Sequence, residues 1–285
     1  MTDRLRIAVV GTGTWGEQHA RIFSRRSDTD LVAVVGRNPE RTGARASVYG
    51  TEPYTDIDQM LAEAKPDLVT VCLPNEGHFD VTLQLIRAGV PLLVEKQLVF
   101  DMLEHLVGPI TSVMAQMTDM TYGDWSTVAI ALEFEGGAVG TMLGSYDSSY
   151  AYQDSQLVEI NGTGGRLVIN DTVRELSIQK AGDEVASVWR AVYFNDDARS
   201  FHGTFDRHVN RVLAALRAGD APPVHATAGR RALAIAHAAI ESHETGTRVG
   251  VPLLTPALRC DATEMPYGRE RATTTAERFR SLSQR

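Results

Sequence analysis

Near its start the chain reads LRIAVVGTGTWG, from Leu5 to Gly16. The β-branched run from Leu5 to Val10 is bounded by glycine, a pattern that predicts a buried parallel strand. Gly11, Gly13 and Gly16 follow in a G-x-G-x-x-G spacing. In such a loop the first glycine allows a tight turn, the second lets the backbone approach a pyrophosphate, and the third lets the next helix pack closely on the strand. This context predicts a dinucleotide-binding loop made of Gly11, Thr12, Gly13, Thr14, Trp15 and Gly16.

Strand and helix patterns alternate over the next eighty or so residues and are joined by short loops. Such alternation predicts a parallel sheet with helices on both faces and right-handed connections. The predicted helices cover 15–26, 57–64 and 79–88, and the predicted strands after the first cover 31–35, 68–73 and 91–94.

From about Met102 the pattern changes to strand-length segments separated by turn residues, which predicts an antiparallel meander. The predicted strands cover 110–117, 127–134, 138–145, 156–160, 166–169, 176–179 and 187–194, and helices follow at 205–218 and 230–244. We therefore expect an α/β protein with a Rossmann dinucleotide-binding domain over 1–98. An α+β domain with a large open, mainly antiparallel sheet is expected over 99–285.

The residue that recognises the adenosine ribose is expected at the end of the second strand, about 20 residues beyond the glycine loop. NAD enzymes usually carry a carboxylate there, whereas this chain has Gly36 followed by Arg37. Without a carboxylate a 2′-phosphate is not repelled, and a guanidinium can bind it with two hydrogen bonds. The sequence therefore favours NADP over NAD, and Arg41 could assist Arg37.

Composition excludes several classes of protein. With 28 lysines and arginines against 36 aspartates and glutamates, the net charge is −8, and no basic block suited to nucleic acid or anionic lipid is present. Cys72 and Cys260 suggest neither a disulfide framework nor a zinc site, and the eight histidines are dispersed, so we expect no metal. The apolar run at the start is shorter than a signal peptide or membrane span, and we expect a cytoplasmic protein.

Three motifs in order give the chain a family resemblance. Gly11 to Gly16 is followed by His19, then by Leu73-Pro74-Asn75 with His78, and then by Glu95-Lys96. In these motifs and in its antiparallel second half the sequence resembles the Gfo/Idh/MocA family of NAD(P)-dependent sugar and cyclitol oxidoreductases. Where that family usually has Glu-Lys-Pro, this chain has Glu-Lys-Gln.

The resemblance implies roles for these residues. Lys96 would lie beside the nicotinamide and hydrogen-bond the substrate hydroxyl, and Glu95 precedes it in the same motif. Leu73, Pro74 and Asn75 would line the nicotinamide ribose. We expect His78 to orient this loop or to cap the next helix. His19 is expected to be a structural residue.

The region after Lys96 is shorter than the resemblance implies. The family has a further helix, strand and crossover there, and then the histidine that usually accepts the proton; here Val99-Phe100-Asp101 follows almost at once. Either an internal segment is absent from the sequence as written, which predicts a chain break between Lys96 and Asp101, or the protein itself is shortened. Asp101 and His105 could form a substitute dyad at i,i+4 spacing, although a packed helix with Leu103, Leu106 and Val107 inward is the plainer interpretation. His202 and His208 remain unassigned.

The sequence thus predicts an oxidoreductase that passes hydride between a nicotinamide cofactor and a secondary alcohol or ketone of a sugar, cyclitol or glycoside. The expected partners are this small substrate and further copies of the chain, in a homodimer or homotetramer. Two alternatives remain open: a catalytically silent dinucleotide-binding scaffold or sensor, and an NAD-dependent glycosidase of the same family.

Overall fold

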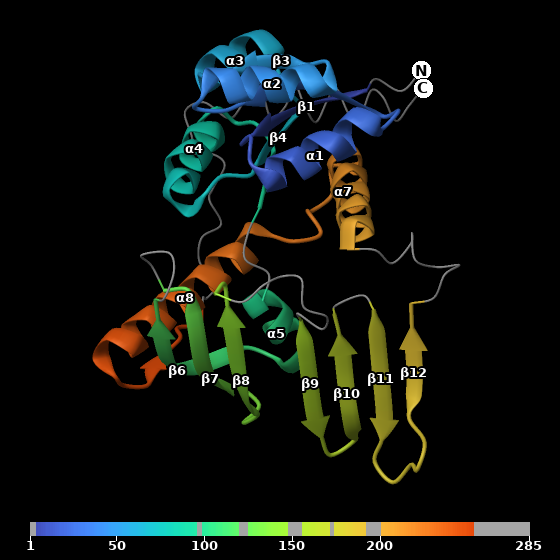
Figure 1. Ribbon diagram of the computed structural model, residues 1–285, viewed down its shortest axis with the longest axis vertical. Helices are drawn as coiled ribbons and strands as arrows, with labels where there is room; N and C mark the ends of the chain where they lie inside the picture. Colours follow the sequence, from blue (N-terminus) through green and yellow to red (C-terminus); the bar gives the residue numbers. More distant parts are fainter. Residues whose placement is uncertain are drawn as a thin grey trace. The chain divides into compact units, whose positions relative to one another are not determined.

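The computed structural model describes residues 4–95, 99–119, 125–147, 156–171, 174–191 and 201–253 (Figure 1). The chain divides into two compact units with the boundary between Gln97 and Leu98. The predicted interruption after Lys96 and the predicted position of Lys96 itself fall on residues 96–98, outside the described residues, and both stay predictions.

The first unit contains a five-stranded parallel sheet in the order β3-β2-β1-β4-β5. Its strands are β1 (Leu5–Val10), β2 (Thr29–Val35), β3 (Glu52–Tyr54), β4 (Leu68–Val71) and β5 (Leu92–Val94). The chain runs outward from β1 to β3 and then returns to the other side of β1, so the strand order reverses between β1 and β4. In open α/β sheets ligands bind at the carboxyl ends of the strands beside this reversal. The topology confirms the predicted Rossmann architecture, and this rule predicts a ligand at the carboxyl ends of β1 and β4.

Helices cover both faces of this sheet. They are α1 (Thr14–Arg25), α2 (Pro39–Tyr49), α3 (Ile57–Ala64) and α4 (Asn75–Arg87). Ala8 and Val10 of β1 pack in one cluster with Met60 of α3 and Leu85 of α4. Four consecutive residues of β1, 7–10, are at most 3% exposed, which requires cover on both sides of the strand.

Several helix and strand bounds differ from the predictions. Helix α2 and the short edge strand β3 were not predicted. Helix α4 begins at Asn75 instead of 79, because Pro74 is its N-cap, and β4 ends at Val71 because the next residues lead into that proline.

The second unit contains helices α5 (Val99–Val107), α7 (Phe201–Ala218) and α8 (Ala226–Thr245). Its strands form two four-stranded antiparallel sheets, in the orders β13-β6-β7-β8 and β12-β11-β10-β9. Their bounds are β6 (Ile110–Thr118), β7 (Thr127–Phe134), β8 (Val139–Ser145), β9 (Leu157–Gly162), β10 (Gly165–Asn170), β11 (Glu175–Lys180), β12 (Ser187–Arg190) and β13 (Val249–Gly250). The antiparallel class is confirmed, with the strands in two sheets instead of one.

Helix α8 lies against one face of the β13-β6-β7-β8 sheet (Figure 1). Ile130 and Leu132 of β7 point to this side and pack with Ile235 of α8, whereas the alternate residues Ala129 and Ala131 are exposed. Since side chains alternate across a strand, the opposite face of this sheet is open in the described residues.

Candidate functional site

The glycine loop has the shape of a cradle for an anion. A Cβ on Gly11 would lie 2.1 Å from the carbonyl oxygen of Cys72, and one on Gly16 would lie 1.9 Å from the carbonyl oxygen of Gly11. Gly11 also has φ of +121°, which L side chains rarely adopt. No described atom lies within 4 Å of a Cβ placed on Gly13, which is the N-cap of α1. The loop is thus closed on its inner side and open at Gly13, as a pyrophosphate at a helix N-terminus requires.

The end of β2 excludes a side chain at residue 36. A Cβ on Gly36 would lie 2.6 Å from Oγ1 of Thr42 and 2.7 Å from Cγ2 of Thr12. Thr42 is buried, and its hydroxyl donates to the carbonyl oxygen of Asn38 at 2.7 Å. Moving Thr42 aside would therefore break this hydrogen bond and disturb the packing around it. A carboxylate at this position is therefore opposed by packing.

Arg37 follows as an exposed cation. Within the described ranges no hydrogen bond or ion pair is found for its side chain. Arg45 of α2 behaves differently, because it pairs with Glu17 of α1 and donates to the carbonyl oxygen of Thr12 at 3.5 Å. Of these two cations, Arg37 is the one available to a phosphate at the carboxyl end of β2.

The loop after β4 lies beside the glycine loop. The N–H of Cys72 donates to the carbonyl oxygen of Val10 at 2.8 Å, which ties the ends of β4 and β1 together. Leu73 packs against the core of the unit, while Pro74 is exposed. His78 is half-buried in the first turn of α4; it is not the cap, because Pro74 takes that position. Asn75 is the first residue of α4, and its side chain lies outside the described part.

A buried histidine connects α1 to the ends of two strands. His19, with 2% of its surface exposed, lies with Nδ1 2.7 Å from Oγ1 of Thr70 and Nε2 3.5 Å from a carboxylate oxygen of Glu95. Burial alone would lower the pKa of His19, but hydrogen bonds and charge attraction from Cys72 and Glu95 raise it from 6.5 to about 9. Cys72 is a free, buried cysteine.

His19 was expected to be a structural residue, and its contact with Glu95 was not predicted. The two residues are 76 positions apart, so no local pattern could have shown it. The end of β5 is nevertheless where Lys96 follows, and the structure therefore brings three predicted motifs, at Gly11–Gly16, Leu73–Asn75 and Glu95, to one edge of the sheet.

The remaining histidine and acid candidates belong to the second unit. Asp101 and His105 lie on α5, where Phe100 is buried while Leu106 is 37% exposed, so the inward stripe predicted to include Leu106 is wrong at that residue. His208 is half-buried on α7, and the side chain of His202 lies outside the described residues. No group of three metal-ligating side chains occurs in the described ranges, nor does any described helix have the length and hydrophobicity to span a membrane.

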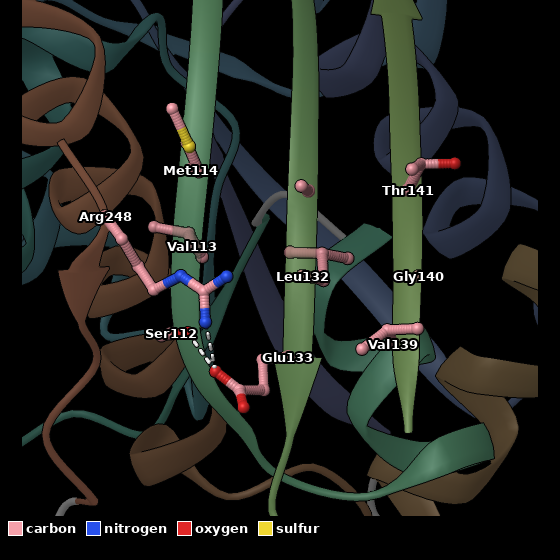
Figure 2. Close-up of a pocket in the computed structure, with 10 residues that line it drawn as sticks. Ser112, Val113, Met114, Leu132, Glu133, Val139, Gly140, Thr141 and Arg248 are labelled. Atoms are coloured by element: carbon pink, nitrogen blue, oxygen red, sulfur yellow. Dashed lines mark hydrogen bonds and ion pairs between the residues drawn. The ribbon is translucent and has the colours of Figure 1, made fainter. Parts of the chain in front are cut away.

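A groove lies on the open face of the β13-β6-β7-β8 sheet (Figure 2). At one end Glu133 accepts hydrogen bonds from Ser112 and from Arg248, both at 2.8 Å. Figure 2 shows this ion pair beside β6 and Val139 on β8. The residues that line the groove are Ser112, Val113, Met114, Ala131, Leu132, Glu133, Val139, Gly140, Thr141 and Arg248.

Comparison with protein families matches both halves of the chain. Residues 5–107 match the model of an oxidoreductase family described as an NAD-binding Rossmann fold, and residues 98–251 match that family's C-terminal alpha/beta domain. The second match alone covers more than half of the chain.

Curated relatives match the first unit. D-glucoside 3-dehydrogenase of Escherichia coli (strain K12) is 38% identical over 94 residues, 32% of this chain and 27% of that protein. Inositol 2-dehydrogenase of Rhizobium meliloti (strain 1021) is 36% identical over 97 residues, 34% of this chain and 29% of that protein. The matched part thus spans less than a third of the length of these relatives.

Solved structures match most of the chain. Levoglucosan dehydrogenase in complex with NADH has a TM-score of 0.78 at 15% identity, over 88% of this chain and 100% of that one. A myo-inositol dehydrogenase from Corynebacterium glutamicum has a TM-score of 0.69 at 18% identity, with the same coverage. At these identities the likeness concerns the fold.

Proposed function

The chain belongs to the Gfo/Idh/MocA oxidoreductase family, and on that premise we propose that it transfers hydride between a nicotinamide cofactor and a secondary alcohol or ketone of a sugar, cyclitol or glycoside. The observation that carries the proposal is the convergence of the glycine cradle, the Leu73–Asn75 loop and Glu95 at one edge of the parallel sheet. The dehydrogenases of glucosides and inositol among its relatives support the same substrate class.

Each part of this edge has a task in the proposed reaction. When bound, the nicotinamide ring accepts or returns hydride at its C4. The glycine loop holds the pyrophosphate, and the Leu73–Asn75 loop supports the nicotinamide ribose. Lys96, directly after Glu95, donates a hydrogen bond to the substrate oxygen and so favours the alkoxide that develops as hydride leaves the carbon. The hydroxyl proton passes to a base in the segment that we expect after Gln97.

A panel of polyols, aldoses and glycosides tests the proposal through absorbance at 340 nm. We expect reduction of the cofactor with at least one member, and its loss in Lys96→Met while cofactor binding persists. Cofactor binding without turnover by protein of full mass would contradict the proposal and favour a silent scaffold. Release of free sugar without net change in cofactor redox state would favour the glycosidase alternative.

We also propose that the cofactor is NADP. Packing by Thr12 and Thr42 opposes the carboxylate that would repel a 2′-phosphate, and Arg37 offers a cation to bind one. A hydrogen bond to a charged group contributes about 1.5–3 kcal/mol, so Arg37→Ala should weaken NADPH binding by about 10- to 100-fold. Binding of NADH should stay unchanged.

The fluorescence of Trp15, which lies in the glycine loop, can follow both titrations. Arg87→Ala is a matched control, because Arg87 lies in the last turn of α4, away from the carboxyl edge. Equal losses of NADH and NADPH affinity in Arg37→Ala, or equal affinities in the wild type, would exclude the assignment.

For the oligomer we propose that the open face of the β13-β6-β7-β8 sheet binds a second copy of the chain. On β8, Val139 and Leu143 are 81% and 80% exposed and form a ridge beside the flat surface of Ala129 and Ala131 on β7. One face thus supplies both a ridge and a flat strip, as a two-fold interface needs. Leu143→Lys should convert the oligomer to a monomer in light-scattering measurements, whereas Val48→Lys, at a 70% exposed site on α2, should not.

A further inference from the structure

His19 is the most completely buried titratable side chain among the described residues, and the proposed reaction gives it no task. A histidine that only filled the core could be replaced by an apolar residue. This one instead presents both ring nitrogens to polar partners on other elements, Thr70 at 2.7 Å and Glu95 at 3.5 Å.

The three elements that meet at this ring carry the parts of the cofactor edge. His19 is on α1, which begins at the glycine loop and is fixed to it by the close packing of Gly16 on Gly11. Thr70 is in β4, just before the loop to Asn75. Glu95 follows β5, where its N–H donates to the carbonyl oxygen of Val71 at 3.0 Å, and it directly precedes Lys96.

The carboxylate of Glu95 is three-quarters buried, with 26% of its side chain exposed. A carboxylate withdrawn from water to this degree needs a charged or hydrogen-bonding partner, and the ring of His19 supplies one. Edge strand β5 has only three residues and pairs with β4 alone in the described part of the sheet. Few backbone contacts therefore fix the end of β5, and a side-chain link there has a large effect on where the next residue lies.

We propose that His19 is a positioning residue, whose contact with Glu95 fixes the end of β5 against the glycine-loop helix and so sets the position of Lys96. The proposal rests on the proposed function for its catalytic consequence. Its structural part, the link between α1 and the end of β5, holds independently of the substrate.

Two conservative variants separate the two contacts of the ring. The amide of glutamine reaches the position of Nε2, so His19→Gln keeps a partner for Glu95. The amide of asparagine reaches the position of Nδ1, so His19→Asn keeps the hydrogen bond to Thr70 and loses the contact with Glu95. A residue that merely filled space or supported the fold would not distinguish these variants in this order.

In the kinetic measurement, His19→Asn should lower kcat by about 100-fold, since a displacement of about 1 Å at a reacting group has effects of that size. Its Kd for NADPH should stay unchanged, because the glycine loop is intact. His19→Gln should recover most of kcat. Equal kcat in the two variants, or a loss of kcat that follows a loss of NADPH affinity, would overturn the proposal.

Hydrogen exchange gives a measurement that needs no turnover. Amides of a peptide covering residues 92–98 should exchange about tenfold faster in His19→Asn than in His19→Gln, because local opening of β5 becomes easier. Equal exchange in both variants would refute the link. Absence of turnover in the wild type would instead refute the proposed function and leave this result to decide the role of His19.

Discussion

The charge on His19 predicts how stability of the first unit depends on pH. The pKa of His19 is raised from 6.5 to about 9 in the folded protein by Cys72 and Glu95, against the opposing effect of burial. A group with a raised folded-state pKa contributes stability that is fully present below its unfolded pKa and is lost as pH rises through the folded value. The contribution of His19 is therefore complete below pH 6.5 and declines toward pH 9 and above.

The size of this contribution follows from the shift. Each pKa unit corresponds to about 1.4 kcal/mol, so a rise from 6.5 to about 9 gives on the order of 3 kcal/mol between pH 6 and pH 10. Other groups also titrate between pH 6 and pH 10, and they are present in both the wild type and His19→Gln. The difference in unfolding free energy between these two proteins therefore isolates the contribution of the imidazole. The wild type should lose about 3 kcal/mol more than His19→Gln over this range.

Urea unfolding at a series of pH values measures this difference. Trp15 is the only tryptophan in the first unit, and its fluorescence in a Trp125→Phe, Trp189→Phe background follows that unit alone. Glu95→Gln should reduce the pH effect, since the Glu95 carboxylate is one of the two partners that raise the pKa. If wild type and His19→Gln keep a constant difference in unfolding free energy from pH 6 to pH 10, the ring is uncharged in the folded state and the reasoning fails.

Three further predictions concern packing. Ser242→Ala should destabilise the second unit by about 2 kcal/mol and lower its Tm by about 5 °C, because the buried N–H of Ala115 and the part-buried carbonyl oxygen of Thr247 lose their partner. Thr245→Ala, at an exposed site, is the calorimetric control. Gly36→Asp alone should weaken NADPH binding without strengthening NADH binding, whereas Gly36→Asp with Thr42→Ala should bind NADH more tightly than the wild type. Stronger NADH binding by the single variant would contradict the steric argument. Glu104→Ala should lower the unfolding free energy of the second unit by about 3 kcal/mol, because it removes the carboxylate that pairs with the half-buried Arg231 of α8 and accepts from the N–H of Ile110. An unchanged denaturation midpoint would show that these contacts contribute nothing.

The local parts of the fold were predictable because each has its own pattern. The glycine loop could be predicted because its three glycines lie within six residues: Gly11 and Gly16 have no room for a Cβ, and Gly13 is the open position. Helix α2 was missed because only Thr42 and Ala46 of its side chains are buried, so it has no apolar period. Its ends did carry a signal: Asn38 is an N-cap followed by Pro39, and Gly50 ends the helix at φ +63°.

The long-range part of the site could not be predicted in the same way. Packing of Thr42 against residue 36, and the contact of His19 with Glu95, join residues that are distant or lie on different elements. The sequence placed Gly36 and Glu95 at strand ends, which is a local inference. Which side chains then meet depends on strand order, and that order is a property of the whole sheet.

The surface beside β5 is consistent with the missing segment that the sequence predicts after Lys96. On this flank Phe79 and Ile86 of α4 are 74% and 46% exposed, and Val94 of β5 is 36% exposed. In the described part of the sheet β5 pairs on one side alone, and exposed large apolar side chains beside such a strand mark a surface that another element covers. A further strand and helix inserted after Gln97 would pair with β5 and pack on α4, and would also supply the expected proton acceptor. An intact mass above the 31.1 kDa of these residues would support that insertion, and a mass equal to it would exclude the insertion and leave β5 as the true edge of the sheet.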